Sequence, residues 1–88
     1  MQRIQRKRTK GWKMPPNTIY IGRPTKWGNM YKIGRDGDAQ ECVEKYEWWL
    51  NFTGRINEID ELKGKNLACF CHLHQPCHAD VLLKLAAR

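Results

Sequence analysis

Two short apolar segments, separated by sequence with helical spacing, restrict this chain to a small α/β arrangement. Thr18–Ile21 is a β-branched and aromatic run that ends at Gly22, and Asn66–Phe70 is a second such run. Between them, apolar residues recur with the three- and four-residue spacing of a helix that begins near Asp38. A helical crossover joins parallel strands of one sheet. We therefore expect a minimal βαβα unit, with a small parallel sheet packed against helices.

The limits of the helices are indicated by their end residues. Asp38 with Glu41 three residues later is typical of a capping box, and Gly54 is expected to end this first helix. A shorter helical segment should follow and end at Gly64, and a final helix should begin near His78. The residues expected on the buried stripe of the first helix are Cys42, Val43, Tyr46, Trp49 and Leu50.

The short chain and the absence of long apolar runs limit the cellular setting. A chain of 88 residues has room for one domain and buries only about 60–65% of its unfolded surface, so a metal often adds stability. No apolar run approaches the roughly 20 residues of a membrane span, and no apolar segment of a secretion signal follows the first residues. We therefore expect a cytoplasmic protein without a membrane partner, whose clustered cysteines are metal ligands or catalytic groups rather than disulfides.

The positive charge is concentrated in the first part of the chain. The net charge is +7; residues 1–35 hold ten Lys and Arg and no acid, whereas residues 36–88 hold six Lys and Arg and nine acids. Residues 1–10 have almost no apolar content and are expected to form a basic flexible arm that precedes a single domain at 11–88. Such asymmetry predicts a polyanionic partner, a nucleic acid or nucleotide bound mainly through phosphate. The alternative is a solubilising tail.

Cysteine and histidine gather where the second predicted strand leads into the last helix. Cys69 and Cys71 are two residues apart and face the same side of a strand. Cys77 and His78 arrive at the N-terminus of the helix, where free N–H groups stabilise a thiolate. Together, Cys69, Cys71, Cys77 and His78 form a candidate Cys₃His zinc site. Two alternatives stay open: Cys71 or Cys77 is a reactive thiol without metal, or the cysteines pack as small apolar residues.

The loop after the first predicted strand carries groups that suit a phosphate or a base. Arginine and lysine can hold an anion, tryptophan can stack on a base, asparagine can bond a base edge or sugar, and glycine lets backbone N–H groups approach an anion. The candidate ligand-binding residues are Gly22, Arg23, Lys26, Trp27 and Asn29. The alternative is a surface loop that Trp27 anchors in the core.

Parallel topology predicts that these two groups of residues meet. Ligands of parallel α/β units bind beyond the carboxyl ends of the strands. The first loop (residues 22–29) and the cysteine loop (residues 71–78) both leave such ends. We therefore expect them to face each other across one cleft.

Several stretches of the chain resemble a known family. They are Gly11-Trp12 with Pro15-Pro16, Tyr20-Ile21-Gly22-Arg23-Pro24 with Lys26-Trp27-Gly28-Asn29, Leu67-Ala68-Cys69-Phe70-Cys71, and Pro76-Cys77-His78-Ala79-Asp80-Val81-Leu82. They resemble a domain-of-unknown-function family, number 4326 (DUF4326), found in bacteria and their phages. The resemblance covers about Gly11 to Leu85 and implies that both loops are family features. It implies no particular activity.

Three functions are compatible with these features. The first, favoured by the charge, is a small nucleic-acid- or nucleotide-binding domain stabilised by zinc. The second is an enzyme for a phosphorylated or nucleotide-like substrate, with Cys71 or Cys77 as nucleophile, His78 as base and Asp80 orienting the imidazole. The third, suggested by the phage association, is a protein that binds a host protein in the host cytoplasm. The residue pattern leaves the enzyme and the binding domain both open.

Overall fold

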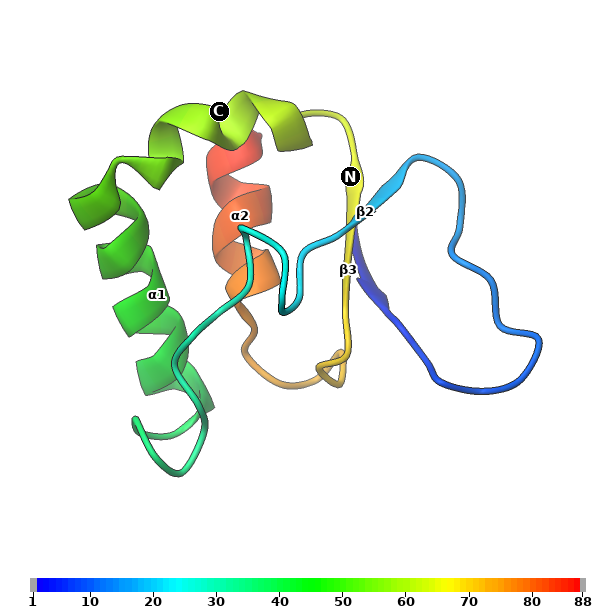
Figure 1. Ribbon diagram of the computed structural model, residues 1–88, viewed down its shortest axis with the longest axis horizontal. Helices are drawn as coiled ribbons and strands as arrows, with labels where there is room; N and C mark the ends of the chain where they lie inside the picture. The colour runs from blue at the N-terminus through cyan, green and yellow to red at the C-terminus, as the bar shows by residue number, and fades with distance from the viewer. Residues whose placement is uncertain (1, 88) are drawn as a thin grey trace.

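A three-stranded parallel sheet with β3 at its centre organises the fold. The computed structural model describes residues 2–87, and its strands β1 (Arg3–Gln5), β2 (Thr18–Tyr20) and β3 (Asn66–Cys69) lie in the order β1-β3-β2 (Figure 1). β3 is parallel to both neighbours. The expected α/β class with a small parallel sheet is therefore confirmed, and β1 is an additional strand.

The expectation that residues 1–10 lack structure is wrong for β1. Arg3–Gln5 pairs with β3, and the Arg6 N–H extends the ladder by donating to the Cys69 carbonyl at 2.7 Å. Only 9% of the Arg3 side chain is exposed, and its guanidinium donates to the Asp80 carboxylate at 2.8 Å. An edge strand needs only one pairing partner and little apolar content. β1 is therefore held by residues far away in the sequence, and its own sequence gives no pattern that predicts a strand. Met1 and Arg88, the ends of the two predicted segments, lie outside the described residues.

The helices begin and end close to where their caps predict. α1 (Ala39–Thr53) starts with a reciprocal capping box, in which Glu41 N–H donates to the Asp38 carboxylate at 2.8 Å and Asp38 N–H donates to the Glu41 carboxylate at 3.0 Å. Gly54, at φ 78°, ends it. The 3₁₀ helix η1 (Arg55–Leu62) and α2 (His78–Ala86) follow. No helix within residues 2–87 is long and apolar enough to cross a membrane.

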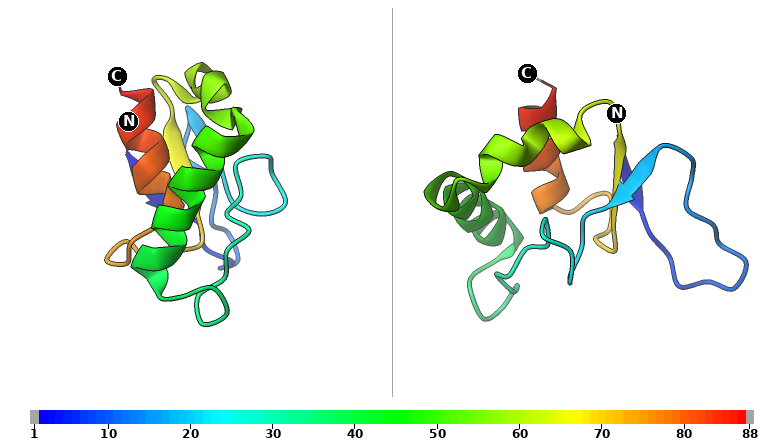
Figure 2. Two further views of the ribbon diagram at one scale, coloured as in Figure 1. Left: turned by 90° about the vertical axis from the view of Figure 1, so that its left-hand side faces the viewer. Right: turned by 45° about the horizontal axis from the view of Figure 1, so that its top comes forward.

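The three helices lie together on one side of the sheet (Figures 1 and 2). α2 contacts β3 and β1, while α1 and η1 contact α2 and each other. Fully buried side chains from every layer form the core: Ile21, Tyr46, Leu50, Leu62, Leu67 and Leu82. Because Leu67 and Cys69 face these helices, Ala68 and its partner Tyr20 face the opposite side of the sheet. The loops that leave β2 and β3 emerge at the same edge.

Candidate functional site

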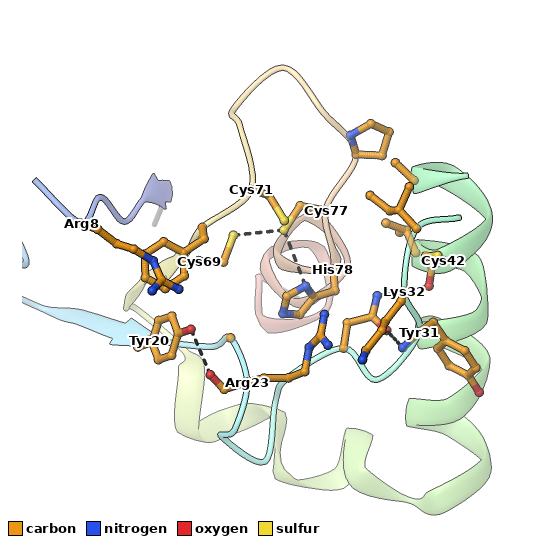
Figure 3. Close-up of a pocket in the computed structure, with 17 residues that line it drawn as sticks. Arg8, Tyr20, Arg23, Tyr31, Lys32, Cys42, Cys69, Cys71, Cys77 and His78 are labelled. Atoms are coloured by element: carbon orange, nitrogen blue, oxygen red, sulfur yellow. Dashed lines mark hydrogen bonds between the residues drawn. The ribbon is translucent and has the colours of Figure 1, made fainter. Parts of the chain in front are cut away.

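The loops that follow β2 and β3 line one cavity of about 600 Å³ (Figure 3). The cysteine loop and its flanks contribute Cys69, Phe70, Cys71, Pro76, Cys77 and His78. The first loop and its continuation contribute Gly22, Arg23, Asn29, Tyr31, Lys32 and Ile33. Arg8, Tyr20 and the first turns of α1 complete the wall. The convergence expected from parallel topology is therefore present in the structure.

Three cysteine sulfurs form a cluster in the wall of this cavity. The Sγ atoms of Cys69, Cys71 and Cys77 all lie within 4.8 Å of one another, and those of Cys69 and Cys77 are 3.1 Å apart. The first two alternate with Phe70 at the end of β3, so they face the same side. Cys77 is the N-cap of α2, and its sulfur accepts from the Ala79 N–H at 3.5 Å. The three sulfurs are close enough to hold one metal ion.

The surroundings favour a thiolate at Cys71. Hydrogen bonds donated by the Cys69 and Cys77 thiols hold the Cys71 pKa well below its usual value, and nearby Arg3 acts in the same direction. The pKa of Cys77 is raised because its thiol donates to the other two sulfurs and is buried. Cys71 is also the only half-exposed member, whereas Cys69 and Cys77 are each 2% exposed. A cluster that already stabilises one thiolate is chemically suited to bind a cation.

The His78 ring is fixed in one orientation beside the sulfurs. Its Nε2 lies 2.8 Å from the Ile21 carbonyl, which can only accept, so Nε2 carries the proton. Burial lowers the His78 pKa below its ordinary value, so the ring is neutral at pH 7 and Nδ1 presents a lone pair. That Nδ1 lies 3.6 Å from Cys77 Sγ. His78 is not part of the group of ligand atoms that lie within 4.8 Å of one another.

Asp80 does not orient His78, and that part of the predicted catalytic arrangement is wrong. Its carboxylate accepts the Cys77 N–H at 3.1 Å, which closes the capping box of α2, and accepts Arg3 Nη1 at 2.8 Å. Arg3 also donates to the His72 carbonyl and so ties β1 to the cysteine loop. A carboxylate at the third helical position reaches back to its own helix terminus. Asp80 therefore has a structural role in the helix cap.

Two of the predicted ligand-binding residues lie outside the cavity. Lys26 is directed to η1, where its Nζ donates to Glu58 at 3.1 Å and to Glu61 at 2.8 Å. Trp27 is 3% exposed, and its carbonyl accepts the Tyr46 hydroxyl at 2.6 Å. Trp27 therefore cannot stack on a base, and the alternative of a loop anchored in the core is confirmed.

The other three residues predicted in the first loop line the cavity. Gly22 and Arg23 do so directly after β2. Asn29 also reaches the wall, but its amide is occupied: Nδ2 donates to the Cys42 carbonyl at 3.3 Å and Oδ1 accepts the Tyr31 N–H at 2.9 Å. Asn29 therefore connects the loop to α1. Its amide is not free for a ligand, so among the side chains predicted in this loop Arg23 is the one available for ligand contacts.

Sequence reasoning missed several residues that shape the cavity. Arg8 and Lys32 add positive charge, and Tyr20 and Phe70 add aromatic rings. Arg8 enters because β1 brings the N-terminal segment beside β3, and no local signal indicated that strand. No carboxylate occurs among the described residues of the lining, although Arg8, Arg23 and Lys32 are cations. The cavity is therefore basic.

Residues 4–88 match the family model described as "Domain of unknown function (DUF4326)". The chain belongs to this family. The match begins before Gly11, where the resemblance was expected to start, so the DUF4326 domain includes part of β1. "Uncharacterized protein R718" of Acanthamoeba polyphaga mimivirus is 29% identical in an alignment 82 residues long, and the match covers 85% of this chain and 57% of that protein. No solved structure matches the chain. Bacterial or phage origin stays a prediction.

Proposed function

We propose that this chain is a small zinc-binding domain that holds a nucleotide, or one nucleotide unit of a nucleic acid, in its basic cavity. The observation that carries the proposal is the three-sulfur cluster in the wall of a cavity with three cations and no carboxylate among its described lining residues. The zinc would stabilise the loop that shapes the cavity, and the cations would bind phosphate.

The sulfur geometry supports a tetrahedral zinc ion. Zinc–sulfur bonds of about 2.3 Å place neighbouring sulfurs about 3.8 Å apart in a tetrahedron. The 3.1 Å between Cys69 and Cys77 and the 4.8 Å limit for all three sulfurs bracket that separation. Side-chain rotations that move the sulfurs by less than about 1 Å are sufficient to reach this separation of about 3.8 Å.

His78 is the fourth ligand in this proposal, and Nδ1 is the ligating atom. An imidazole ligand usually donates its other N–H to a carbonyl or carboxylate, which is the role of Ile21 here. The 3.6 Å from Nδ1 to Cys77 Sγ equals the edge of about 3.6 Å that tetrahedral zinc gives for one nitrogen and one sulfur. Zinc bound by both groups would replace this Cys77–His78 contact, with Cys77 giving up its proton on binding.

The cavity suits a nucleotide in size and chemistry. Its volume of about 600 Å³ lies within the range of about 300–1,000 Å³ that is usual for ligand pockets. Arg23 and Arg8 offer planar donors for phosphate oxygens, and Tyr31 and Phe70 offer rings for a base. A nucleic-acid partner and a cytoplasmic setting are part of this proposal, and a protein partner in a host cell is the alternative.

Metal content and stability test the zinc centre. Protein purified without chelator is expected to contain one zinc per chain, and chelation is expected to lower its melting temperature. Cys77→Ser should abolish stoichiometric zinc, whereas Cys42→Ser, which changes the cysteine outside the cluster, should retain it. Metal-free protein of unchanged stability would overturn the zinc centre. A single fast-alkylating cysteine in such protein would support the alternative of an enzyme with Cys71 as nucleophile.

Calorimetric titration with nucleoside monophosphates tests the cavity. Binding should weaken as salt is added, because phosphate contacts release counterions. Arg23→Ala should weaken it by about 1–3 kcal/mol, the usual cost of one charge-assisted phosphate contact. Arg35→Ala is the matched control, because Arg35 lies outside the cavity lining and already pairs with Asp36 at 2.8 Å. No binding at low salt would overturn the nucleotide site.

A further inference from the structure

We propose that a second anion site adjoins the cavity and binds the backbone phosphate of a single-stranded nucleic acid whose terminal nucleotide occupies the cavity. This inference rests on the proposed function and specifies its ligand class. The second site is a hollow of about 410 Å³ lined by Arg6, Lys7, Arg8, Arg23 and the rings of Tyr20 and Phe70, together with Pro24. We call it the arginine hollow.

The cations of the arginine hollow have no carboxylate partner within residues 2–87. Arg6, Lys7, Arg8 and Arg23 take part in none of the ion pairs of the described chain. Some cations elsewhere are paired, as Lys26 is with two glutamates and Arg55 with one, and unpaired lysines such as Lys13 do not line the hollow. Four unpaired positive charges around one hollow repel each other, and a bound phosphate group would remove that repulsion.

Aromatic rings, rather than acids, hold Arg6 and Arg8 in place. Arg6 Cζ lies 4.5 Å from the Tyr20 ring centroid, and Arg8 Cζ lies 4.5 Å from the Phe70 centroid. The two rings meet edge to face at 5.9 Å on the sheet surface opposite the helices. A guanidinium above a ring keeps its N–H groups free at the edge, because the ring contacts only the face of the ion. Those N–H groups remain available to phosphate oxygens.

The arginine hollow is continuous with the cavity. Arg8, Tyr20, Arg23 and Phe70 line both, and Figure 3 shows Arg8, Tyr20 and Arg23 around the side of the cavity that the two share. A mononucleotide whose phosphate contacts Arg8 and Arg23 leaves Arg6 and Lys7 of the hollow free, whereas the next phosphate of a strand can reach them. The cavity has room for one nucleotide unit, and a base held in a duplex would first have to leave the base stack to enter it. Uncompensated cations beside aromatic rings are typical of single-strand binding.

Binding by four probes at constant salt tests the inference: a nucleoside monophosphate, an eight-nucleotide linear single strand as DNA and as RNA, a covalently closed circle of the same single strand, and inorganic polyphosphate. The linear strand is expected to bind at least about tenfold tighter than the monophosphate, because the hollow adds phosphate contacts. The circle, which has no terminal nucleotide, and polyphosphate, which has no base, should both bind more weakly than the linear strand.

Variants of the hollow separate this inference from the function on which it rests. Lys7→Ala and Arg6→Ala should weaken binding of the linear strand, each reducing its salt slope by about 1, and leave the monophosphate affinity unchanged. Lys10→Ala, outside the hollow, is the control and should change neither the affinity for the linear strand nor that for the monophosphate. Lys7→Ala should not affect folding, because the Lys7 side chain is exposed.

Each contrary result has a distinct meaning. Monophosphate binding without tighter binding of the linear strand would overturn the arginine hollow and leave the nucleotide site in place. A circle that binds as tightly as the linear strand would overturn the terminal position of the ligand. If polyphosphate bound as tightly as the linear strand, the hollow would attract any polyanion, and its specificity for nucleic acid would be overturned. Failure of every probe would overturn the proposed nucleotide site, and the hollow with it.

Discussion

Replacing Arg3 by alanine is expected to destabilise the domain, because this side chain joins β1 to two later parts of the chain. Its guanidinium donates to the His72 carbonyl and, at 2.8 Å, to Asp80. A hydrogen bond from a charged group contributes about 1.5–3 kcal/mol. The Asp80 side chain is 53% exposed, so solvent screens that ion pair to about 0.2–1 kcal/mol.

One term opposes these losses. Arg3 Nε is buried without a hydrogen-bond partner within the described chain, and its removal recovers about 1 kcal/mol. The net effect of Arg3→Ala is therefore a loss of about 0.7–3 kcal/mol of unfolding free energy. For a domain of this size, that loss lowers the melting temperature by about 3–24 °C.

Urea unfolding at one fixed zinc concentration for all variants, followed by tryptophan fluorescence, measures this loss. Lys13→Ala is the control, since Lys13 is exposed and has no ion pair within residues 2–87. A double-mutant cycle with Asp80→Asn should give a coupling of about 0.2–1 kcal/mol that shrinks at high salt. An Arg3→Ala variant with the stability of the control would refute the reasoning that β1 is anchored to α2 through Arg3.

Three further changes test other parts of the structure. Tyr46→Phe removes the donor to the buried Trp27 carbonyl and should cost about 1–3 kcal/mol in urea unfolding; a loss below about 0.5 kcal/mol would contradict that bond. Gly22→Ala places a methyl group 2.6 Å from Tyr20 Cζ, so the ring must shift and nucleotide affinity should fall in calorimetry; unchanged affinity would show that this wall is not used. Lys26→Ala should leave nucleotide affinity unchanged, because Lys26 pairs with glutamates of η1. A weaker affinity would show that Lys26 takes part in nucleotide binding.

The elements with strong local signals could be predicted from the sequence. The capping box of Asp38 and Glu41 placed the start of α1, and its apolar spacing identified Val43, Tyr46 and Leu50 as core residues. β1 could not be predicted in this way, because Ile4 is its one apolar residue and its stability comes from β3, which is distant in sequence. The one available signal was that isolated isoleucine in a charged segment.

The site was predictable where backbone periodicity determines direction. Alternation along β3 placed Cys69 and Cys71 on one side, and the start of α2 brought Cys77 to them. Loop residues gave no such information, because a loop has no fixed period. The sequence therefore left open whether Trp27 points into the core. It also did not predict that Lys26 pairs with carboxylates of η1, whose position depends on how η1 packs.

The central position of β3 determines the order in which the fold can be completed. Both edge strands precede β3 in the chain, yet each pairs only with it, so neither can join the sheet before Asn66–Cys69 is in place. Closing loops of such length is entropically costly and slows folding. Because Cys69 is the last residue of β3, closing the sheet also fixes the position of one sulfur of the cluster. A metal ion captured at that moment would hold the newly closed sheet together.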